Sequence, residues 1–121
     1  MPDCYTVHNL NRQNVVAGQI HIAGTSAQRR EGLLAIDQLE DGGGLWIAPC
    51  EAIHTFGMKL PIDVVFLDRD LHVTKLVPLL GPNRLSFSIS AHSVLELKAG
   101  AIERSAIGVG DRLRFTPVEG H

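Results

Sequence analysis

The sequence predicts a mainly β protein of the α+β class, built as a small barrel-like antiparallel or mixed sheet with one short helix near residues 25–34. Two observations lead to this prediction. About eight short runs of β-branched, aromatic or alternating apolar residues are separated by turn formers. A helix start signal is clear at Thr25–Gln28, where Thr25 and Gln28 fit a capping box. Closure into a barrel would pair the edges that so many short strands expose, and an open two-layer sheet is the alternative.

The first half of the chain supplies four of these elements. Strands are expected at 5–7, 15–17, 19–23 and 45–48, the last with Trp46 as its largest core anchor. The helix follows the second and third of them and ends at about Leu34. Asp41 to Gly44 reads as a flexible loop and not as a phosphate-binding loop, since no Lys-Ser/Thr pair and no helix follow it.

The most apolar run of the chain, Ile62–Leu67, reads as a buried strand. A period of two places Asp63 on the face of Val65 and Leu67, with the other three side chains on the opposite face. If both faces are covered, the carboxylate needs a cation or several N–H donors. The cationic partners available are His54, Lys59, Arg84, Arg104 and Arg112. Asp63 therefore either ties the strand to a neighbouring loop or belongs to a site.

The second half continues the β pattern. Residues 72–77 should form a hairpin with the central strand, and 85–89 alternates as a half-buried strand. Further strands are expected at 94–97 and 112–116, with a helical turn within 101–107. Gly110 should adopt positive φ in the turn before the last strand. The default place for a ligand is a concave patch where the 50–61 loop meets the 78–92 loop.

Three parts of the sequence resemble one family, the domain of unknown function 192. Its central motif matches from His54 to Asp68, as H-T-F-G-M-K-L-P-I-D-V-V-F-L-D. The motif T-x-x-x-R-x-x-G-L matches from Thr25 to Leu33, and V-L-E-L-x-A-G followed by G-D-R-L matches from Val94 to Leu113. Gly57 and Leu71 depart from residues usual in the family. The likeness covers about residues 19–116 and implies a small, mainly β domain, but it supplies no function.

Composition limits the possible partners. The 121 residues suit a single domain, 1–121, with 45% hydrophobic and 20% charged residues, as is typical of soluble proteins. A net charge of −2 provides no basic face for nucleic acid, and no apolar run has transmembrane length. No signal peptide is visible, so we expect a cytoplasmic protein whose Cys4 and Cys50 stay reduced. Oligomeric state is not predicted.

Three functional classes stay open. The first is a binding module for a small molecule or a protein, with His54, Lys59, Asp63 and Arg84 as candidate ligand-binding residues. The second is a purely structural or interaction domain. The third is an enzyme with hydrolase-like acid–base chemistry, in which Asp63 orients His54 within hydrogen-bonding or one-water reach. The sequence does not decide whether the protein is an enzyme, and no catalytic residue is assigned.

No metal or other cofactor is expected. Cys50, His54 and Met58 look like a soft-ligand set for copper or zinc. Residues four apart in an extended segment lie about 13 Å from one another, too far for one ion to bridge. Cys50 is instead expected to be a buried thiol and Met58 a core residue.

Overall fold

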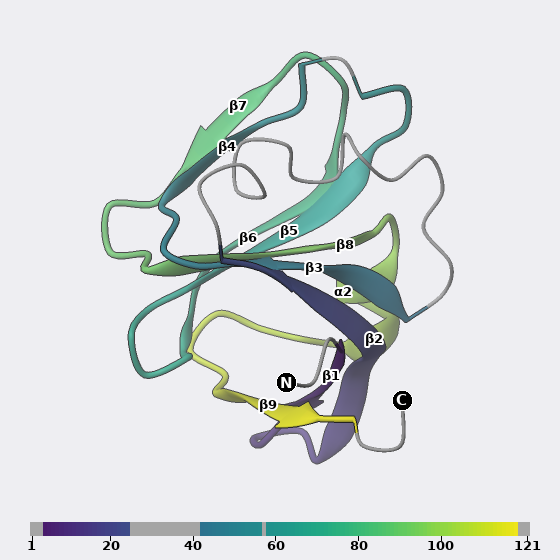
Figure 1. Cartoon of the computed structure of the whole chain (residues 1–121), viewed down its shortest axis with the longest axis vertical. Helices are drawn as coiled ribbons and strands as arrows, with labels where there is room; N and C mark the ends of the chain where they lie inside the picture. Colours follow the sequence, from purple (N-terminus) through teal and green to yellow (C-terminus); the bar gives the residue numbers. More distant parts are fainter. Residues whose placement is uncertain (1–3, 25–41, 57, 119–121) are drawn as a thin grey trace.

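The computed structural model describes residues 4–24, 42–56 and 58–118. It shows a large curved sheet with a separate two-stranded ribbon at one end (Figure 1). The elements in chain order are β1 (Cys4–Asn9), β2 (Asn14–Ala23), β3 (Gly43–Ile47), β4 (Ala52–His54), β5 (Ile62–Leu67), β6 (Val73–Leu80), β7 (Leu85–Phe87), β8 (Ser93–Lys98), α2 (Ala101–Ser105) and β9 (Leu113–Pro117). The predicted mainly β class is confirmed. The helix expected near residues 25–34 lies outside the described residues.

The large sheet has seven strands in the order β6-β5-β8-β3-β2-β1-β9. All neighbours are antiparallel except β2 and β3, which makes the sheet mixed as expected. The sheet is not a closed barrel. Its two edge strands approach each other at one end only, through a bridge between His72 and Arg112. Backbone bonds from Val73 N to Asp111 O and from Leu113 N to Leu71 O flank this bridge among the described residues.

The central strand β5 is buried on both faces, as its sequence predicts. Val65 and Leu67 belong to an inner core on the concave side of the sheet, together with α2. Its opposite face, with Val64 and Phe66, belongs to an outer core under the β4–β7 ribbon. The inner core comprises Val7, Val16, Ala17, Ile20, Val65, Leu67, Val73, Leu95, Leu97, Ala101, Ile102, Ile107 and Leu113. The outer core comprises Ala23, Leu45, Ile47, Ile53, Ile62, Val64, Phe66 and Val94.

At two positions the structure shows why the residue is glycine. A Cβ atom at Gly44 would collide with the backbone carbonyl of Glu96, because β3 and β8 pair closely there. Gly43 and Gly44 therefore begin β3, and the predicted flexible loop does not extend over them. Gly110 has φ of 93°, which confirms the positive φ expected before the last strand.

In the described part of the chain no helix has both the length and the apolarity to cross a membrane.

Candidate functional site

The segments 50–61 and 78–92 do meet, as expected, and they meet as paired strands. β4 and β7 form an antiparallel ribbon in which His54 pairs with Leu85 and Ala52 pairs with Phe87. In Figure 1 the ribbon lies at the end of the molecule opposite β9. Its middle pair, Ile53 and Ser86, is buried against the large sheet. The ribbon thus has one covered face and one free face.

Thr55 holds the end of this ribbon in place. Its hydroxyl donates to Gly81 O at 2.6 Å and accepts the N–H of Arg84 at 2.8 Å. Its backbone N–H bonds Arg84 O, and its carbonyl accepts the N–H of Asn83. The side chain is fully buried. Thr55 therefore closes the turn between β6 and β7 against β4. In the sequence Thr55 stands out only as a motif position, and no local pattern signals this role.

The free face of the ribbon is apolar. The alternation in β7 is as predicted, but its polarity is reversed: Ser86 is buried while Leu85 and Phe87 are 67% and 57% exposed. Phe56, which is 54% exposed, stacks on His54 with ring centroids 5.2 Å apart. Lys75 borders the other end, with Nζ 5.7 Å from the Phe87 ring centroid. We call the set His54, Phe56, Lys75, Leu85 and Phe87 the ribbon face.

More than half of the exposed large hydrophobic residues in the described chain come from the ribbon and the segments next to it in sequence. Of the ten large hydrophobic residues exposed in the described chain, six lie on the ribbon, on β6 or on their connections. They are Phe56, Leu60, Leu79, Leu85, Phe87 and Ile89. Such a concentration marks interaction surfaces more often than isolated exposed residues do.

Asp63 does not belong to this face. Its side chain is fully buried, and its two oxygens accept the N–H of Leu79 at 2.9 Å and the N–H of Ile102 at 2.8 Å. The partners are N–H donors and not any of the cations considered from the sequence. Ile102 lies in the first turn of α2, so the carboxylate also faces the positive end of that helix. Asp63 ties β5 to β6 and α2.

His54 and Asp63 are not hydrogen-bonded to each other in the described structure. His54 lies exposed on β4, and its described contact is with the Phe56 ring. Lys59 and Arg84 are also exposed, on the two connections next to the ribbon. Of the four candidate residues, three therefore lie on or beside the ribbon surface, and Asp63 lies below it in the core.

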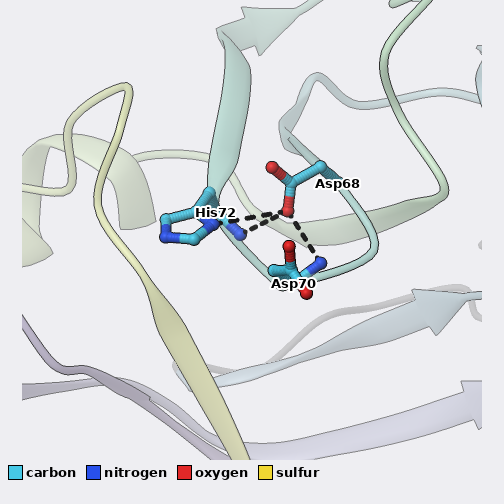
Figure 2. Close-up of side chains that lie close together, drawn as sticks. All are labelled: Asp68, Asp70 and His72. Atoms are coloured by element: carbon cyan, nitrogen blue, oxygen red, sulfur yellow. Dashed lines mark hydrogen bonds and ion pairs between the residues drawn. The ribbon is translucent and has the colours of Figure 1, made fainter.

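The residues considered for a soft metal site are used elsewhere. Cys50 and Met58 pack against the outer core, and the Cys50 thiol donates to Ala52 O. A different cluster was missed by the sequence analysis: ligand atoms of Asp68, Asp70 and His72 lie within 4.8 Å of one another (Figure 2). Asp68 Oδ1 accepts the N–H of both Asp70 and His72 at 2.9 Å. These hydrogen bonds form the turn between β5 and β6, and the turn itself brings the three side chains together.

Asp111 organises the place where the sheet edges meet. Its Oδ2 accepts Asn9 Nδ2 at 2.9 Å, Gly108 N at 2.8 Å and Arg12 Nε at 3.4 Å. Burial alone would raise the pKa of Asp111, but these hydrogen bonds and the charge of Arg12 outweigh burial and lower the pKa. This network fixes the β1–β2 turn to the turn before β9, and it is structural.

Comparison with known proteins identifies the family and the fold. A family model, DUF192, described as "Uncharacterized ACR", matches residues 7–115. A protein from Sinorhizobium meliloti described as a candidate transcription regulator superposes with a TM-score of 0.82, at 21% identity over 95% of this chain and 94% of its own. A protein of unknown function from Novosphingobium aromaticivorans superposes with a TM-score of 0.78. The two are 23% identical, over 92% of this chain and 83% of the other. No curated protein matches the sequence.

Proposed function

We propose that this chain, which belongs to the DUF192 family, is a binding module that docks a protein partner on the ribbon face. The observation that carries the proposal is the reversed polarity of β7, where Leu85 and Phe87 face solvent and Ser86 faces the core. An alternating strand normally buries its apolar side. Here the fold buries less than half of the two largest side chains of the strand, and a partner would cover the rest.

Burial of the apolar side chains on this face would favour docking. Burial of a Leu or Phe side chain contributes about 1.5–3 kcal/mol. Phe56, Leu85 and Phe87 together therefore offer several kcal/mol to a partner that covers them. Thr55 and the buried pair Ile53–Ser86 hold the ribbon before any partner arrives, so little ordering cost is expected on binding.

Acid–base catalysis is the less favoured function. It requires a carboxylate that orients the imidazole of His54, but the buried Asp63 uses both of its oxygens to accept backbone N–H groups. His54 then contributes to docking through its ring, which stacks on Phe56. Lys59 and Arg84 flank the apolar patch as polar rim residues.

Selection from a phage-displayed library of random peptides on the intact protein tests the proposal. We expect enriched peptides whose affinity falls about tenfold in Phe87→Ser, because one buried aromatic anchor is lost. Val109→Ser is the control, since Val109 is an apolar residue with 65% exposure, against 57% for Phe87, but lies in the turn before β9. It should leave the affinity unchanged. Enriched peptides that bind wild type and Phe87→Ser equally, or a selection that enriches none, would contradict the proposal.

A further inference from the structure

The charge around the ribbon face differs from that of the whole chain. Residues 52–62 and 71–92, which contain β4, β6, β7 and their connections, carry three basic side chains and no acidic one. The remaining residues carry eight basic and thirteen acidic side chains. Of the acidic residues that flank the two segments in sequence, Asp63 is buried, whereas Glu51 and Asp70 are exposed. The segments that form the apolar face therefore carry a net charge of +3 in a protein whose net charge is −2.

The three basic side chains are Lys59, Lys75 and Arg84. Lys75 belongs to the face itself, where its Nζ donates to Phe87 O at 2.9 Å. Arg84 precedes Leu85 directly and Lys59 lies between β4 and β5, and both are exposed. Lys75 thus contacts Phe87 directly, and Arg84 adjoins Leu85 in sequence, so these two cations border the apolar side chains as interface rim residues do.

Resting on the proposed function, we infer that the partner segment is an extended peptide that combines apolar side chains with carboxylates. Its apolar side chains cover Phe56, Leu85 and Phe87, and its carboxylates lie against the Lys59, Lys75 and Arg84 side chains. Opposite charges at a rim strengthen association chiefly through the encounter rate, and this contribution is screened by salt. A basic or neutral apolar segment would lack this contribution.

Three labelled peptides of about twelve residues test the inference by fluorescence anisotropy on the full chain. One alternates Leu with Glu, and in the other two Ser or Lys replaces Glu. At low salt we expect the Glu peptide to bind about tenfold more tightly than the Ser peptide, and the Lys peptide more weakly than both. The advantage of the Glu peptide should disappear at about 0.5 M salt.

Charge-reversed and apolar variants separate the inference from the proposed function. The double variant Lys59→Glu/Arg84→Glu changes exposed side chains only, and it should lose the preference for the Glu peptide while it still binds the Ser peptide. Phe87→Ser should bind both the Glu peptide and the Ser peptide more weakly than wild type does. If wild type binds the Glu and Ser peptides with equal affinity and Phe87→Ser binds both more weakly, the inference is overturned and the proposed function stands. Affinity that does not depend on Phe87 would overturn both. Co-sedimentation with phosphatidylserine vesicles but no binding of the Glu peptide would also overturn the inference, in favour of a lipid surface.

Discussion

Replacement of Asp63 by Asn tests whether this carboxylate is a structural tie. The two oxygens accept backbone N–H groups, a partly buried one from Leu79 at 2.9 Å and a buried one from Ile102 at 2.8 Å. Asn keeps one acceptor and turns its NH₂ group toward the other N–H, which loses its partner. One lost charge-assisted bond and one unsatisfied buried N–H group together cost about 2–4 kcal/mol. We expect the free energy of unfolding to fall by that amount.

Urea denaturation followed by circular dichroism measures this change, with Asp70→Asn as the control. Asp70 is exposed, and its substitution should change the free energy of unfolding by less than about 0.5 kcal/mol. Because Asp63 lies below the ribbon face, folded Asp63→Asn protein should bind the selected peptides as wild type does. An Asp63→Asn variant as stable as Asp70→Asn would refute the assignment. A stable Asp63→Asn variant that no longer binds the peptides would also refute it.

Three further predictions concern the framework that holds the site. Thr55→Val removes the hydroxyl between Gly81 O and Arg84 N and should cost about 2–3 kcal/mol, whereas Thr55→Ser keeps both bonds and should cost about 1 kcal/mol in urea unfolding. Ala106 ends α2 at φ of 57° and is exposed, so Ala106→Gly should stabilise by about 0.5–1 kcal/mol and raise the melting temperature by a few degrees. Asp111 has a lowered pKa, so its contribution to stability is present above the unfolded value of 3.8 and is lost as the pH falls through the folded value. Asp111→Asn should therefore be less stable at pH 7 and lose less stability than wild type on acidification below pH 3.8; parallel acid titrations would count against this.

The local pattern was enough to predict most strands. The β5 bounds and the faces of its side chains follow from six consecutive residues with a period of two. The helical turn at α2 and the positive φ of Gly110 also follow from nearby residues. The order of the strands in the sheet does not follow from nearby residues. β2 pairs with β3 in parallel and β5 pairs with β8 across about thirty residues, and such non-local pairs are chosen by burial of the whole sheet.

The meeting of the two segments was predicted, but the contacts that its residues make were not. The two segments that meet there were identified, and three of the four candidate residues lie on or beside the ribbon. The partners of Asp63 were not predictable, because they are backbone N–H groups 16 and 39 residues away that carry no side-chain signal. The exposed face of β7 was not predictable either. Alternation gives two faces but does not say which of them the rest of the fold covers.

Chemical-shift mapping of a selected peptide on the wild-type protein tests the central claim most directly. If the ribbon face is the docking surface, titration should shift the amide signals of residues 52–56 and 84–89, and the shifts should saturate with the affinity measured by anisotropy. The amides of β1 and β9 at the far end of the sheet should not move. Saturating shifts confined to β1, β9 or the turn at Gly110, with none on β4 and β7, would contradict the account.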